Sequence, residues 1–162
     1  MGVRSSDHQL VAGKQYFEHA VQIEGAVQGL RKEVITATTG QALTPEQSGA
    51  TVILSDNVLN VALPTPEVGL NYKFILTADM GSNTSTVKAT SDGSSAANLF
   101  TGIVDVNGSP TSTVNKDVIT FANAATEGDY CEVTCGGTGT SSGNPTWHYY
   151  CLGDASGAIT VA

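Results

Sequence analysis

The stretch that decides the fold class is residues 43–78, LTPEQSGATVILSDNVLNVALPTPEVGLNYKFILTA. It contains three runs rich in β-branched and aliphatic residues, at 51–55, 58–63 and 70–78. Ser-Asp-Asn separates the first two runs, and these residue types bond their own backbone and tolerate left-handed dihedral angles. The pattern therefore predicts a tight hairpin between the first run and the second.

Two prolines and a glycine separate the second run from the third. Pro64 and Pro66 give no amide donor to a strand ladder, and Gly69 permits the positive φ that a reversal of the chain needs. Apolar side chains recur at every second position of the third run: Leu70, Tyr72, Phe74 and Leu76. We therefore expect a half-buried antiparallel strand.

The composition also favours an all-β body. The chain has 162 residues, 18 of them glycine, and only 14% of residues are charged and 6% aromatic. Short strands joined by small polar turns have such a composition, whereas helix-rich domains need periodic blocks of Glu, Lys, Leu and Ala. A chain of this length buries about 68–70% of its unfolded surface, which suffices for one domain. Because turn signals recur about every eight to twelve residues, we expect an antiparallel β-sandwich or a jelly-roll-like barrel.

A second hairpin is predicted after residue 99. Residues 99–106 read as a strand, in which Gly102 is a candidate bulge position. Asn107 and Gly108 then favour a type I′ turn, because both accept positive φ. A proline lies near this tip at position 110, so the return strand is expected to begin only near Asp117.

The three cysteines fall in two runs, DYCEVTC and TWHYYCL, that are expected to pair across a loop of Gly, Ser and Thr. Cys131 and Cys151 would then face each other, so a disulfide is geometrically feasible. The default expectation for a cytoplasmically made protein is nevertheless buried free thiols, Cys135 included. The spacing of these cysteines with His148 matches no zinc knuckle or ribbon, so neither a metal site nor a cofactor is predicted.

Charge divides the chain into two parts. Residues 1–40 contain four basic and four acidic residues, whereas residues 41–162 contain three lysines and eleven acidic residues, so the net charge of −8 belongs to the second part. An acidic surface repels phosphate, and we therefore expect no nucleic-acid partner. No run of about 18 apolar residues is present, so we expect no membrane span. A hydrophobic signal core is not evident near Met1, which predicts a chain used without secretion.

We interpret residues 1–40 as an extended N-terminal arm and residues 41–162 as the β-sandwich body. An extended segment cannot bury its apolar side chains by itself, so we expect the arm to lie on another subunit or another protein. The candidate contact residues of the arm are Arg4, Lys14, Tyr16, Phe17, Arg31 and Lys32.

Catalysis is not predicted, and the chain is not expected to be an enzyme. No serine or cysteine lies in a nucleophile-elbow context, and His148 has no identifiable partner acid. The aromatic residues beside it, Trp147, Tyr149 and Tyr150, could stack on a sugar ring as in carbohydrate-binding modules. Trp147 and Tyr149 are two positions apart, however, and we favour the alternative that they face the core or a subunit interface.

Residues 43–76 resemble a pattern of small virion structural proteins of tailed bacteriophages. The pattern is LT-x-x-x-SG, two strands joined by a turn, LP-x-P-x-x-G, and a third strand. The closing stretch GDYCEVTCGGTGTSSGNPTWHYYCLGDASGAITV is similar to their last hairpin, so the resemblance covers residues 43–161 with weaker similarity in the middle. The three cysteines and the first 40 residues depart from the pattern. The matched residues look structural: Leu63, Pro64, Pro66 and Gly69.

This resemblance implies a capsid decoration, or cement, protein without catalytic residues. Such a protein would be made in the host cytoplasm and would bind the major capsid protein on the outer surface of the virion head as a homotrimer. The alternative is a virion fibre, spike or carbohydrate-binding module that attaches to host surface glycans through Trp147, Tyr149 and Tyr150.

Overall fold

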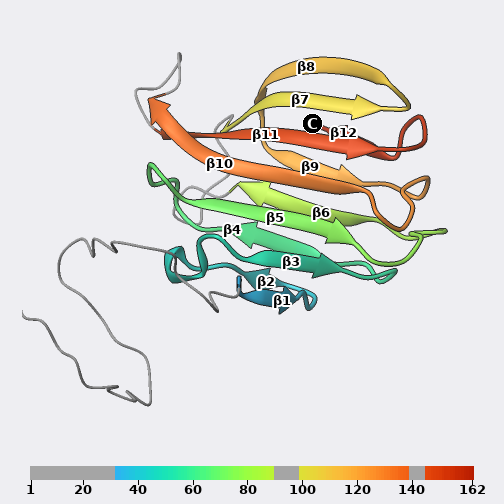
Figure 1. Ribbon diagram of the computed structural model, residues 1–162, viewed down its shortest axis with the longest axis horizontal. Coiled ribbons are helices and arrows are strands. Elements are labelled where there is room, and N and C mark those ends of the chain that lie inside the picture. Colours follow the sequence, from blue (N-terminus) through green and yellow to red (C-terminus); the bar gives the residue numbers. More distant parts are fainter. Residues whose placement is uncertain (1–31, 90–98, 139–144) are drawn as a thin grey trace, which may run out of the picture. The chain divides into compact units, whose positions relative to one another are not determined.

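The computed structural model describes residues 32–89, 99–138 and 145–162, and these residues fold into two β-sheets that pack together as a sandwich (Figure 1). In the described residues one sheet has seven strands in the order β1-β3-β5-β10-β11-β7-β8, and the other has five in the order β12-β9-β6-β4-β2. The predicted all-β sandwich is confirmed. Both sheets are mixed rather than purely antiparallel, because β1, β3 and β5 pair in parallel, as do β2, β4 and β6.

The strands of the larger sheet, in spatial order, are β1 Val34–Thr36, β3 Thr51–Leu54, β5 Asn71–Leu76, β10 Tyr130–Thr138, β11 Pro145–Gly153, β7 Phe100–Val106 and β8 Ser109–Lys116. The strands of the smaller sheet are β12 Ile159–Val161, β9 Val118–Phe121, β6 Ser85–Ala89, β4 Asn60–Leu63 and β2 Gln41–Ala42. One short 3-10 helix, η1 Pro45–Gln47, precedes β3.

The tight hairpin predicted between residues 51–55 and 58–63 is wrong, because β3 and β4 belong to different sheets. Each strand has one apolar face, and both faces are fully buried in the single core: Val52, Leu54, Val61 and Leu63. Two short strands with apolar faces bury more surface when those faces stack across a sandwich than when the strands pair edge to edge. The turn at 55–57 therefore carries the chain from one sheet to the other.

The third run of the deciding stretch is confirmed as a half-buried strand. On β5, Tyr72, Phe74 and Leu76 point into the core, and the residues between them are half-buried on the opposite side. The strand is antiparallel to β10, as expected, but parallel to β3 on its other edge.

The β7–β8 hairpin confirms the turn prediction and corrects the position of the return strand. Asn107 and Gly108 have φ values of 53° and 68°, as a type I′ turn requires. The return strand begins directly at Ser109, and Pro110 pairs with Asp105. Proline is tolerated here because β8 is the last strand of the described sheet, and an edge strand does not need every amide donor.

A register shift lies beside Gly102, but the extra residue is on β8 and not at the predicted position. Phe100 pairs with Lys116 and Gly102 with Thr113, so two residues of β8 lie opposite Thr101. Gly102 is required for another reason: a side chain there would overlap the carbonyl oxygen of Tyr149 on the neighbouring strand.

The body begins at residue 32, not at residue 41. Strand β1 pairs with β3, and Ala37 is part of the core. The interpretation of residues 1–40 as one arm is therefore wrong for residues 32–40. The rest of the predicted arm, residues 1–31, lies outside the described residues.

Candidate functional site

Strand β11 contains most of the residues that the sequence marked for chemistry, and its side chains alternate between two faces. Trp147, Tyr149 and Cys151 point into the core. The intervening residues, His148, Tyr150 and Leu152, point outward and are exposed. Because successive strand residues face opposite sides of a sheet, this alternation separates residues that are adjacent in the sequence.

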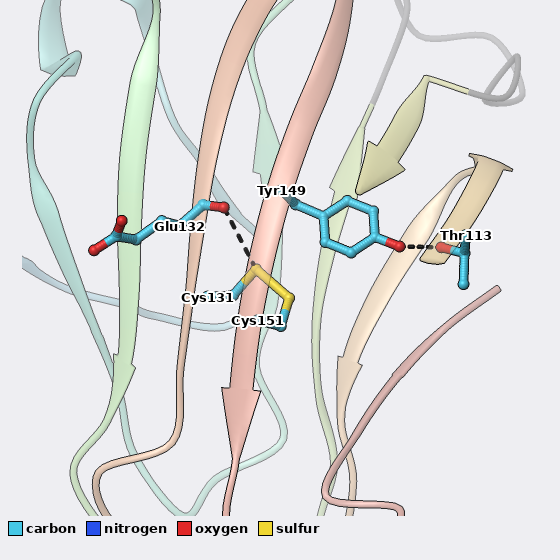
Figure 2. The surroundings of a disulfide bond; sticks show 5 residues. All are labelled: Thr113, Cys131, Glu132, Tyr149 and Cys151. Carbon is cyan, nitrogen blue, oxygen red and sulfur yellow. Dashed lines mark hydrogen bonds between the residues drawn. A yellow bond between two sulfur atoms is a disulfide. The ribbon is translucent and has the colours of Figure 1, made fainter. Parts of the chain in front are cut away.

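The predicted glycan-stacking residues do not share a surface. Trp147 is 0% and Tyr149 5% exposed, whereas Tyr150 is 41% exposed on the opposite face. The ring of Trp147 lies 5.9 Å from that of Tyr72, and the hydroxyl of Tyr149 contacts Thr113 Oγ1 (Figure 2). The favoured interpretation of Trp147 and Tyr149 as core residues is confirmed, and only Tyr150 remains available to a ligand.

Cys131 and Cys151 form a disulfide, so the expectation of free thiols is wrong for these two residues (Figure 2). They are direct partners in the β10–β11 register, with Cα atoms 4.1 Å apart. Both are fully buried beneath the larger sheet. The sulfur of Cys131 also lies 3.8 Å from the carbonyl oxygen of Glu132, which is a contact rather than a hydrogen bond because a disulfide sulfur has no proton.

Among the described residues Cys135 is the free cysteine, as expected, and it is buried. Burial raises its pKa to about 11. The thiol therefore stays protonated at neutral pH and is a poor nucleophile and metal ligand. Since Cys131 and Cys151 are bonded to each other, the cysteines and His148 do not form a zinc site; within the described ranges no group of His, Cys, Asp or Glu is arranged to hold a metal ion.

An acidic hollow lies where the loops before β10 and after β11 meet the β7–β8 turn. Its lining includes Glu127, Asp129 and Asp154. Asp129 is only 4% exposed, and its two carboxylate oxygens accept hydrogen bonds from the amides of Thr126 and Asp154, each at 3.1 Å. Through these two hydrogen bonds Asp129 connects the loop before β10 to the loop after β11, and its role is therefore structural.

Replacement of Asp129 by asparagine is expected to lower the free energy of unfolding by about 1–3 kcal/mol. Each oxygen of a carboxyl group, ionised or protonated, keeps a lone pair that can accept a hydrogen bond, whereas the amide NH2 would face one of the two backbone N–H donors. Burial raises the pKa of Asp129 above its ordinary 3.8, so the folded state holds this proton more tightly than the unfolded state. Protonated Asp129 therefore contributes to the free energy of unfolding. This contribution is fully present below pH 3.8 and is lost as the pH rises through the pKa of Asp129 in the folded state.

The difference in stability between wild type and Asp129→Asn should therefore be largest at low pH and should narrow as the pH rises. Urea denaturation at a series of pH values measures this difference. Asp56→Asn is the matched control, because Asp56 is exposed and is not among the charges that shift the pKa of Asp129. Equal stability of the Asp129 variant and the control would contradict the assigned role.

The predicted arm contacts Arg4, Lys14, Tyr16, Phe17 and Arg31 lie outside the described residues. Lys32, the first described residue, is exposed and lines a small hollow together with Lys73 and Glu132.

Sequence reasoning missed the outward side of the larger sheet, where apolar side chains from neighbouring strands adjoin. We call this surface the apolar face and define it by six residues: Ile53, Ile75, Tyr130, Leu152, Tyr150 and Ile103. The signal that could have revealed it is an isoleucine, Ile75, on the otherwise polar side of the 70–78 alternation. Its neighbours could not be identified without the strand order.

No protein-family model matches this chain, and neither the curated proteins nor the solved structures contain a significant match. Within the described residues, no helix has the length and apolar character needed to cross a membrane.

Proposed function

We propose that this chain is a bacteriophage capsid decoration (cement) protein that binds the outer surface of the assembled head and stabilises it without catalysis. The proposal starts from the resemblance of residues 43–161 to small virion proteins. The observation that supports it most is the position of β1, which is the first strand at one edge of the larger sheet and follows directly on residues 1–31. A segment of this length can span up to about 100 Å, so it can reach a partner far from its own body.

The distribution of charge also supports a division of roles. Residues 1–31 contain three basic and three acidic residues, whereas residues 32–162 contain four lysines and twelve acidic residues. A segment without net charge has no net repulsion towards a partner of either sign, whereas the acidic body repels any acidic surface. We therefore assign the contact with the major capsid protein to residues 1–31, and we expect the acidic body to face solvent.

Such contacts would stabilise a shell by mass action. A ligand that binds only the assembled shell shifts the equilibrium towards assembly. Where one molecule contacts two capsid subunits, its second contact forms at a high effective concentration and need not be strong by itself.

Deletion of residues 1–31 is expected to reduce co-sedimentation with DNA-filled heads at least tenfold, while the body retains its β-sheet circular dichroism and its cooperative unfolding. In the full-length chain, Tyr16→Ala combined with Phe17→Ala should weaken binding in the same direction. Thr160→Ala, a change at an exposed residue of β12, is the matched control and should bind like wild type. Full occupancy by the truncated body would refute the assignment.

The alternative, a fibre, spike or carbohydrate-binding module, is not favoured by the geometry. Two of its three stacking residues, Trp147 and Tyr149, are buried in the core. Saturable binding on a glycan array that Tyr150→Ala abolishes would revive it.

A further inference from the structure

The outward sides of the two sheets differ in chemistry. On the smaller sheet, a polar row crosses four strands in register: Thr160, Thr120, Thr86 and Asn60. Thr86 Oγ1 donates a hydrogen bond of 2.7 Å to Asn60 Oδ1, so part of this row bonds within itself. The larger sheet presents the apolar face instead. The two sides therefore offer different chemistry to another protein.

The apolar face is continuous across neighbouring strands. Its first row crosses β3, β5, β10 and β11 in register: Ile53, Ile75, Tyr130 and Leu152. In the next row, Tyr150 on β11 pairs with Ile103 on β7. Leu152, Tyr150 and Ile103 are 38%, 41% and 41% exposed, and contiguous exposed apolar surface of this kind marks interaction sites.

An ion pair lies beside these apolar residues. Lys73 Nζ is 2.9 Å from Glu132 Oε1 and 4.4 Å from the centre of the Tyr130 ring. Glu132 is also the register partner of Tyr150. Lys73 and Glu132 thus lie side by side between apolar residues, and a second acid, Asp105, adjoins Leu152 at the β7 end of the face.

This arrangement is complementary to itself. A twofold axis that passes between Lys73 and Glu132 would bring Lys73 of each copy onto Glu132 of the other, so both charges would stay paired after burial. Paired charges avoid the large penalty of an isolated buried charge. Isologous interfaces of this kind are the commonest in soluble homo-oligomers.

The size of the face fits a weak dimer. Its five strands, about 4.8 Å apart, span about 19 Å, and five residues along a strand cover about 17 Å. Two such faces together would bury about 650 Å², which is the size of a weak, transient contact.

We propose that the apolar face packs against the same face of a second copy of this chain, with Lys73 and Glu132 exchanging partners across a twofold axis. The inference is independent of capsid binding, because it concerns the free protein. It also differs from the homotrimer that the resemblance implies, which would need a different surface. Because each copy carries a net charge of −8, the dimer should tighten as added salt screens the repulsion between the bodies.

The test uses sedimentation equilibrium of the full-length protein without heads. Wild type should form a concentration-dependent dimer. Lys73→Glu places two negative groups on the face and Glu132→Lys two positive groups, so each variant alone should dimerise at least tenfold more weakly. An equimolar mixture of the two variants should recover a heterodimer, since each face then meets its opposite charge. Lys88→Glu, on the outward side of the smaller sheet, is the matched control and should dimerise like wild type.

Three outcomes would overturn the proposal. The first is a wild type that stays monomeric at about 1 mM, a concentration at which even a weak interface forms. The second is association of the two charge variants, as dimer or trimer, that is as strong as that of wild type. The third is a mixture of the two folded variants that forms no heterodimer. As a test of the apolar contacts, Ile103→Lys should also abolish the dimer, and dimerisation unchanged by that variant would count equally against it.

Discussion

Replacement of Trp147 by alanine is expected to lower the free energy of unfolding by about 3–5 kcal/mol, the range for loss of a large buried aromatic side chain. Trp147 is among the largest fully buried side chains of the described residues, and it packs against Tyr72. Alanine would lose this burial and leave a cavity in the core.

Trp147→Phe should cost less, for two reasons. It keeps an aromatic ring against Tyr72, and it removes an indole N–H that is buried without a hydrogen-bond partner in the described part of the chain. Tyr150→Ala, three residues along β11 on the exposed side, is the control and should stay within about 0.5 kcal/mol of wild type. Urea denaturation at low protein concentration gives these values. A marginal effect of Trp147→Ala would show that the ring is not a core residue.

Removal of the disulfide by the double substitution Cys131→Ala and Cys151→Ala is expected to cost about 3 kcal/mol, because the bond closes a loop with a sequence separation of 20 and restricts the unfolded chain. The lost sulfur atoms leave small cavities in the core, which adds to the cost. Wild type in reductant should lose a similar amount once the bond has been reduced.

Two controls make this prediction specific. Cys135→Ala keeps the disulfide and should respond to reductant as wild type does, whereas the double variant should not respond at all. Mass spectrometry after denaturation should detect one free thiol per wild-type chain. Three free thiols, together with no effect of reductant on stability, would contradict the bond.

The features that could be predicted from the sequence depend on neighbouring residues. The alternation of Tyr72, Phe74 and Leu76 predicted β5, and the pair Asn107 and Gly108 predicted the β7–β8 turn. Both signals are local, because the side on which a strand residue lies and the φ that a turn residue accepts depend on adjacent positions in the sequence. The same period indicated that Trp147 and Tyr149 share a side of β11.

The features that could not be predicted depend on which strands become neighbours. Residues 51–63 read as a hairpin because the turn at 55–57 is compatible with one, but the apolar sides of β3 and β4 face each other across the core. Likewise β1 is too short for its pattern to be visible before β3 lies beside it. The apolar face was invisible for the same reason, since its six residues come from five strands.

The two margins of the larger sheet bear on how the protein behaves at high concentration. In the described residues one margin is β1, only three residues long, and the other is β8, where Pro110 has no amide hydrogen and Asn115 adopts a φ of 57°. Short, proline-bearing or distorted outermost strands are poor templates for lateral growth. The sheet is thus guarded against adding strands from further molecules and forming amyloid-like ribbons, even when many copies are crowded together.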